Sequence, residues 1–180
     1  MANAKYKLSV VVVVYDMKRQ AMNTLFSLST TYQRNITADE YEIIVVENNS
    51  KHNLIAAEVE GLSGNFKYIL RDEKKPTPIY AANYGIDIAD GESICLMIDG
   101  ARLLSPRAIR YTLDAFAINS NAVVAIPGYH IGEHDHKFNN INLHDEKTEE
   151  KLLDSIKWHD NGYEIFNVSC LSGANTHGYL

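Results

Sequence analysis

The sequence predicts an α/β protein in which helices cover both faces of a mostly parallel central sheet. Three observations predict it: an almost continuous β-branched apolar run at residues 8–15, the alternation of further apolar runs with helical patterns, and acids that directly follow several runs. A run this apolar is typical of a strand buried on both faces of a parallel sheet. Strands that alternate with helices form βαβ units, so the expected architecture is a Rossmann-like, three-layer α/β/α sandwich.

The expected elements alternate along the chain. Strands are expected at residues 8–15, 41–46, 66–70, 93–98 and 122–126, with a further short one at 163–168. Helices are expected from Asp16 to about Tyr32, over 53–59, from Thr77-Pro78 to Gly91, from Ser105-Pro106 to beyond Phe116, and over 146–158. Two of these helices begin with serine or threonine before proline, which combines a capping side chain with a residue suited to the first helical position.

Length and composition indicate one full core. The chain has 180 residues, of which 46% are hydrophobic, and this is enough for a single domain. We expect the core to span residues 1–129. A polar stretch rich in histidine follows at 130–144, and its length suggests a binding or lid loop. Its histidines and acid could hold zinc if they converged, although solvated loop residues are the more common case; they are His130, His134, Asp135, His136 and His144.

Charge and cysteine content exclude several classes of function. The net charge is −6 and the basic residues are scattered, so no stripe that would bind nucleic acid is expected. No signal peptide or membrane span is visible, and we expect a cytoplasmic protein. Cys95 and Cys170 have neither a disulfide framework nor metal-ligand spacing, which predicts two plain buried thiols.

Polar residues follow four of the expected strands at their carboxyl ends, where open α/β sheets bind ligands. These groups are Tyr15-Asp16, Glu47-Asn48-Asn49, Arg71-Asp72 and Asp99-Gly100-Ala101-Arg102. They combine acceptors for a base or ribose with cations for phosphates, which suits a nucleotide. No Walker A lysine motif and no Gly-x-Gly-x-x-Gly follows the first strand, so the ordinary ATP and dinucleotide sites are disfavoured.

Five segments resemble the inverting glycosyltransferases of family 2, which have the GT-A fold. In order, they are SVVVVVYD (9–16), EIIVVENNS (42–50), AANYGI (81–86), ADGE (89–92) and LMIDGARLLSP (96–106). The resemblance implies an enzyme that transfers a sugar from a nucleotide-diphosphate sugar to a hydroxyl acceptor, which would be a carbohydrate or a lipid-linked molecule. It also implies a role in bacterial-type cell-surface polysaccharide synthesis, with peripheral membrane association as an option.

The resemblance also implies roles for individual residues. Tyr15 and Glu47 would border the nucleobase and the ribose, and Arg71 would lie near the base. Asn83 belongs to the motif in the helix behind the site, and Asp99 would be the first acid of an Asp-x-Asp motif that faces the ribose and the metal-bound diphosphate. The full predicted binding set is Tyr15, Asp16, Glu47, Asn49, Arg71, Asn83, Asp99, Gly100 and Arg102.

Four positions depart from the family pattern. Asp16 stands where asparagine is common, and Glu47 stands where aspartate is usual. Ala101 replaces the second acid of the Asp-x-Asp motif, and Arg102 follows it where another acid is frequent. Alanine cannot ligate a metal, so Mg²⁺ or Mn²⁺ binding through Asp99 is expected to be weakened or lost. Arg102 would then partly replace the ion as a fixed cation near the diphosphate.

The acceptor half of the family follows the nucleotide half and supplies the catalytic base. Residues 130–180 are expected to lead into that half, which is missing or truncated here, and no residue of the chain stands out as the base. An alternative hypothesis is a non-catalytic GT-A-like module with a degenerate Asp-x-Asp motif. A nucleotidyltransferase is disfavoured because no glycine- and lysine-rich loop follows the first strand. Trp158 continues a helical apolar stripe and is expected in the core rather than in a sugar site.

Overall fold

The computed structural model describes residues 4–73, 75, 77–98, 100–132 and 146–172. The chain divides into two compact units, residues 1–118 and 119–180. The first unit contains β1 (Tyr6–Val14), α1 (Lys18–Leu28), the 3₁₀ helix η1 (Ala38–Glu40), β2 (Tyr41–Asn48), α2 (Ala56–Glu60), β3 (Phe66–Arg71), α3 (Ile79–Asp87), β4 (Gly91–Ile98) and α4 (Ala108–Ile118).

The four strands of this unit form one parallel sheet in the order β3-β2-β1-β4. β1 and β2 lie at the centre, and the apolar residues of β1 from Leu8 to Val14 are almost completely buried. A strand in this position is covered on both faces, which explains its continuous β-branched composition. The predicted α/β class with a mostly parallel sheet is therefore confirmed.

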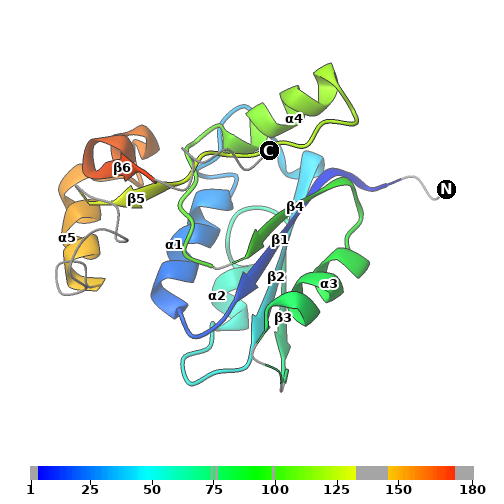
Figure 1. The fold of residues 1–180 in the computed structure, drawn as a ribbon, viewed down its shortest axis with the longest axis horizontal. Helices are drawn as coiled ribbons and strands as arrows, with labels where there is room; N and C mark the ends of the chain where they lie inside the picture. Colours follow the sequence, from blue (N-terminus) through cyan, green and yellow to red (C-terminus); the bar gives the residue numbers. More distant parts are fainter. Residues whose placement is uncertain (1–3, 74, 76, 99, 133–145, 173–180) are drawn as a thin grey trace. The chain divides into compact units, whose positions relative to one another are not determined.

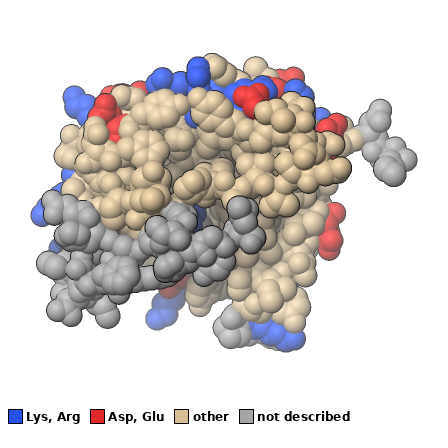
Figure 2. Space-filling model, turned by 45° about the horizontal axis from the view of Figure 1, so that its top comes forward, with Lys and Arg blue, Asp and Glu red and all other residues tan. Residues whose placement is uncertain are grey.

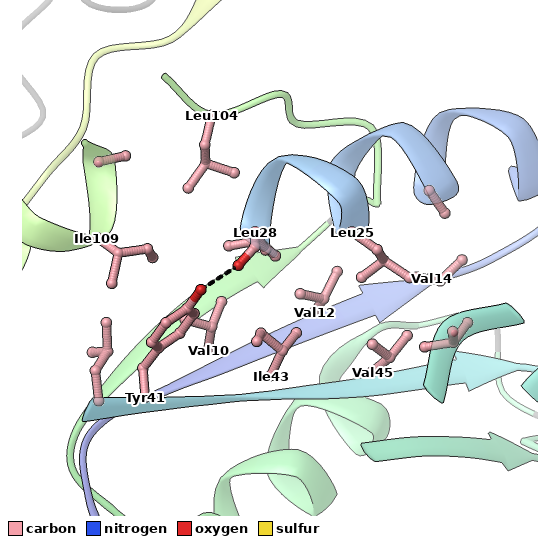
Figure 3. Close-up of a cluster of buried hydrophobic side chains, with 14 of the residues drawn as sticks. Val10, Val12, Val14, Leu25, Leu28, Tyr41, Ile43, Val45, Leu104 and Ile109 are labelled. Carbon is pink, nitrogen blue, oxygen red and sulfur yellow. Dashed lines mark hydrogen bonds between the residues drawn. The ribbon is translucent and has the colours of Figure 1, made fainter. Parts of the chain in front are cut away.

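Helices cover both faces of the sheet, as Figure 1 shows for α3 on one side and α1 and α2 on the other. On the α1 side, Val10, Val12 and Val14 of β1 pack against Leu25 and Leu28 (Figure 3). Residues of α2 and α4 belong to the same buried cluster. The Tyr41 hydroxyl donates a hydrogen bond of 2.7 Å to the Leu28 carbonyl, so this buried phenol is satisfied.

Helix α3 approaches the sheet closely because residue 85 is glycine. A Cβ atom at Gly85 would lie 2.4 Å from Val11 Cγ1 and 3.3 Å from Val46 Cγ2. The first distance is too short for any real side chain. The close approach places α3 directly over β1 and β2, where Ala81 and Ala82 are also buried against Val46.

The second unit contains β5 (Tyr129–Ile131), α5 (Glu146–Ile156), the 3₁₀ helix η4 (Gly162–Val168) and β6 (Ser169–Leu171). β5 and β6 form an antiparallel pair, and Tyr129 contacts Phe166 edge to face with ring centroids 5.1 Å apart. Trp158 is only 2% exposed, which confirms that it packs in a core.

Two predicted strands are wrong. Residues 122–126 have no strand pairing among the described residues, and Val123 is 90% exposed. A β-branched run becomes a strand only where a neighbouring strand accepts its hydrogen bonds, and the sequence does not show the neighbour. Residues 163–168 belong to the 3₁₀ helix η4, where the Glu164 N–H donates to the Asn161 carbonyl.

The described surface carries charges of both signs. On the face drawn in Figure 2, Lys and Arg side chains are interspersed with Asp and Glu, and the described residues of that face form no continuous basic stripe. None of the described helices has the length and apolar character needed to cross a membrane.

Candidate functional site

The ends of β1, β2 and β3 bring several predicted site residues to one edge of the sheet. In the strand pairing, Val14 lies opposite Glu47, and Asn48 lies opposite Arg71. The Asn49 N–H then donates to the Arg71 carbonyl over 2.7 Å, which continues the pairing by one step. The carboxyl ends of these strands therefore bring several of the predicted polar residues to the same edge of the sheet.

Glu47 is a fully buried carboxylate at this edge. Its Oε2 accepts hydrogen bonds from the Tyr68 hydroxyl at 2.6 Å and from the Leu54 N–H at 2.9 Å. Its Oε1 is buried too and has no partner among the described residues. A buried carboxylate oxygen without a donor is costly, so this atom is a candidate acceptor for a bound ligand. Burial and the adjacent Glu47 carboxylate raise the pKa of Tyr68, which keeps the phenol protonated as a donor.

Two further buried polar atoms at the ends of β2 and β3 lack partners among the described residues: Asn48 Oδ1 and Arg71 Nε. The Arg71 guanidinium lies over the ring of Tyr84 in α3, 4.3 Å from its centroid. A cation held on an aromatic face loses little further freedom when it meets an anion or an acceptor. The ends of β2 and β3 thus carry, on both faces of the sheet, polar atoms that are unpartnered in the described part of the chain: Glu47 on the α1 face beside Tyr68, and Asn48 and Arg71 on the α3 face beside Tyr84.

The turn after β1 carries Tyr15 and Asp16. Tyr15 is 60% exposed, which leaves its ring accessible to a ligand. Asp16 has a φ of 52°, in the left-handed region, and its Oδ1 lies 2.8 Å from Nδ1 of the exposed His52. This contact connects the β1–α1 turn with the β2–α2 connection.

Asp16→Ala is expected to lower the free energy of unfolding by about 1 kcal/mol, because alanine pays the steric penalty of the left-handed conformation that aspartate and asparagine partly avoid. Asp16→Asn, the residue common in the resembling family, is expected to change it by less than about 0.5 kcal/mol. Urea titration of both variants measures the difference. Wild-type stability in the alanine variant would contradict this account of the turn.

The chain after β4 is held against α1. The Gly100 carbonyl accepts a hydrogen bond of 2.6 Å from the buried Thr24 hydroxyl, and Thr24 Oγ1 accepts the Arg102 N–H at 2.8 Å. Gly100 is buried and Arg102 is exposed. Asp99, the predicted first acid of the Asp-x-Asp motif, lies outside the described residues.

The remaining predicted residues are distributed around this edge. Asn83 is exposed on α3, and Asn49 Oδ1 accepts from Asn53 Nδ2 at 2.8 Å. Besides Asn53, four side chains outside the predicted set contact it: Thr24, His52, Tyr68 and Tyr84. Tyr84 could have been found from the sequence, because it lies inside one of the family motifs. The other three could not, because they reach the site through contacts between segments that are distant in sequence.

Among the described residues, no group of three or more His, Cys, Asp or Glu side chains is placed to hold a metal ion. Of the histidine-rich stretch, His130 is described and its Nε2 lies 3.1 Å from Ser172 Oγ, whereas His134, Asp135, His136 and His144 lie outside the described residues. Metal binding by Asp99 stays a prediction.

The two cysteines are free and only partly buried, which is less than the sequence analysis predicted. Burial raises the pKa of the Cys95 thiol, so this residue is a poor nucleophile.

Comparison with known proteins identifies the family. The model of the family described as Glycosyl transferase family 2 matches residues 9–171. The chain belongs to glycosyltransferase family 2. Its match extends over both units and includes all the strand ends described above, so the resemblance found in the sequence is confirmed.

Solved structures agree on the fold. A crystal structure of S. aureus TarS 1-349 has a TM-score of 0.56 and 21% sequence identity, and the match covers 63% of this chain and 33% of that one. A second structure of S. aureus TarS has a TM-score of 0.52 and 18% identity, with 62% and 20% covered. This chain thus spans a third or less of those structures. No curated protein matches the chain.

Proposed function

We propose that this glycosyltransferase family 2 chain binds a nucleotide-diphosphate sugar at the carboxyl edge of β1–β4. The observations that carry the proposal are the buried polar atoms at these strand ends that have no partner among the described residues: Glu47 Oε1 on the α1 face of the sheet, and Asn48 Oδ1 and Arg71 Nε on the α3 face. Two acceptors and one donor match the mixed donors and acceptors of a base and a ribose. Tyr15, exposed beside them, offers a ring for contact with the base.

The proposed reaction is inverting glycosyl transfer. An acceptor hydroxyl oxygen forms a bond to the anomeric carbon of the donor, and the bond from that carbon to the diphosphate oxygen breaks in line with it. The nucleoside diphosphate leaves, and a carboxylate that we do not assign takes the hydroxyl proton. The acceptor is proposed to be a carbohydrate or a lipid-linked molecule used in cell-surface polysaccharide synthesis, and the location is proposed to be cytoplasmic.

The leaving diphosphate needs its charge neutralised. Asp99 is the residue that we propose would hold Mg²⁺ or Mn²⁺, and such an ion would supply positive charge to the diphosphate. Ala101 cannot assist it, so we propose that Arg102, exposed after the turn at Gly100, contributes the cation directly.

A second candidate function is a non-catalytic GT-A-like module that binds a nucleotide without turnover. The presence of Ala101 where the family motif has an acid favours it. Both functions predict nucleotide binding, and they differ in whether the bound donor sugar is transferred or hydrolysed.

Calorimetric titration of the chain with UDP, GDP and dTDP, each with and without Mn²⁺, tests the proposal. We expect saturable binding of one nucleotide, weakened when Asp99→Ala removes the acid of the motif. A gain of less than about tenfold in affinity with Mn²⁺ is expected, because one carboxylate without the second holds the ion poorly. Binding of none of the three nucleotides would contradict the proposed function. Release of free sugar from the matching sugar nucleotide would favour the enzyme over the non-catalytic module.

A further inference from the structure

A row of buried polar side chains on and after α1 holds the backbone that follows β4. Ser27 Oγ accepts the Leu104 N–H at 3.1 Å. Further along, Gln33 Nε2 donates to the Ser105 carbonyl at 3.1 Å, and Gln33 Oε1 accepts the Ile109 N–H at 3.3 Å. Residues 101–105 have no regular secondary structure, so these contacts replace the hydrogen bonds that a helix or strand would provide.

Of the side chains in this row, Thr24 contacts the backbone nearest to the end of β4. It is completely buried, and its single hydroxyl joins two backbone groups on either side of Ala101. The hydroxyl donates to the Gly100 carbonyl at 2.6 Å and accepts the Arg102 N–H at 2.8 Å. The Gln20 carbonyl, one helical turn earlier, is farther from the hydroxyl at 3.1 Å. Since a hydroxyl has one proton, the shorter contact to Gly100 is the favoured one.

Packing fixes the same turn from a second direction. A Cβ atom at Gly100 would lie 3.0 Å from Val14 Cγ2 and 3.3 Å from Ala21 Cβ. The backbone at Gly100 therefore rests on the end of β1 and on the first turns of α1, with little room to shift. This packing and the Thr24 hydrogen bonds together fix the path of the backbone after β4. They therefore also fix the backbone position from which the Arg102 side chain extends.

We propose that Thr24 is a positioning residue for the nucleotide site: its hydroxyl fixes the Gly100–Arg102 turn so that Arg102 reaches the diphosphate of the bound nucleotide. This inference rests on the proposed function, because it assumes that a nucleoside diphosphate binds at this edge. Thr24 itself is completely buried below the turn.

The test compares Thr24→Val, which keeps the shape and removes the hydroxyl, with Thr24→Ser, which keeps the hydroxyl. Thr112→Val is the matched control, because the buried Thr112 hydroxyl donates within its own helix, to the Ala108 carbonyl. Each variant is titrated with the nucleotide that the wild type binds, and amide hydrogen exchange is measured at Arg102.

We expect Thr24→Val to weaken nucleotide binding about tenfold, as for the loss of one or two buried hydrogen bonds, and to speed exchange at Arg102 by at least about tenfold. Thr24→Ser should restore both values to within about threefold of the wild type, because its hydroxyl makes the same contacts. Thr112→Val should lose thermal stability without either change. Equal affinity in Thr24→Val and the wild type would overturn the role of Thr24.

The two proposals fail in different ways. If the wild type binds no nucleoside diphosphate, the proposed function fails, and the positioning role fails with it. If the wild type binds and Thr24→Val binds equally well while Arg102 exchanges faster, the nucleotide site stands and only the positioning role is wrong.

Discussion

Glu47→Gln is expected to weaken nucleotide binding by at least about thirtyfold, which is about 2 kcal/mol, while the fold is retained. The glutamine carbonyl oxygen replaces Oε2 and keeps both the Tyr68 hydroxyl and the Leu54 N–H as donors. The amide NH₂ then takes the place of Oε1, which has no partner among the described residues. A donor from the nucleotide would meet another donor there. Calorimetric titration of the variant measures the loss.

Two control variants separate binding from stability. Glu47→Ala leaves two donors unpaired in a buried position and is expected to lower the free energy of unfolding by about 3 kcal/mol. Tyr68→Phe removes only one of the two donors to Oε2. It is expected to lower the free energy of unfolding by about 1 kcal/mol and to leave the nucleotide affinity unchanged. Wild-type affinity in Glu47→Gln would show that Oε1 does not contact the nucleotide and that Glu47 serves only the fold.

Gly85→Ala is expected to lower the free energy of unfolding by about 2 kcal/mol. Two effects oppose each other: alanine in a helix interior gains about 1 kcal/mol over glycine, whereas overpacking a core commonly costs up to about 3 kcal/mol. The added methyl would lie 2.4 Å from Val11 Cγ1. Because Val11 is a fully buried residue of a central strand, it has no room to move, and the steric cost dominates. Thermal or urea unfolding measures the change.

Gly128→Ala is the matched control, since a Cβ atom there meets nothing within 4 Å. A change smaller than about 0.5 kcal/mol is expected at that position. If Gly85→Ala instead raised stability, α3 would be able to move away from β1 at little cost. The tight packing of this helix behind the site would then be irrelevant to the fold.

The periodicity of the sequence was sufficient for the four parallel strands and their helices. Long β-branched runs at 8–15 and 41–46 can be buried only in a sheet covered on both sides, so their composition alone identifies them as central strands. The same reasoning failed at 122–126, where the run is equally β-branched but Val123 is exposed and unpaired in the described part of the chain. Composition shows that a segment can pair, and the tertiary structure decides whether a partner is present.

The sequence by itself determined the family, the sheet and the edge at which the site residues gather, because strand ends and motif order are local properties of the chain. Only the tertiary structure showed that Glu47 is held by Tyr68, that Arg71 lies on Tyr84, and that Thr24 holds the turn at Gly100. These partners are 13 residues apart in the Arg71–Tyr84 pair and 76 residues apart in the Thr24–Gly100 pair. Strand register and helix packing bring such residues together, and neither is encoded in the spacing of any single segment.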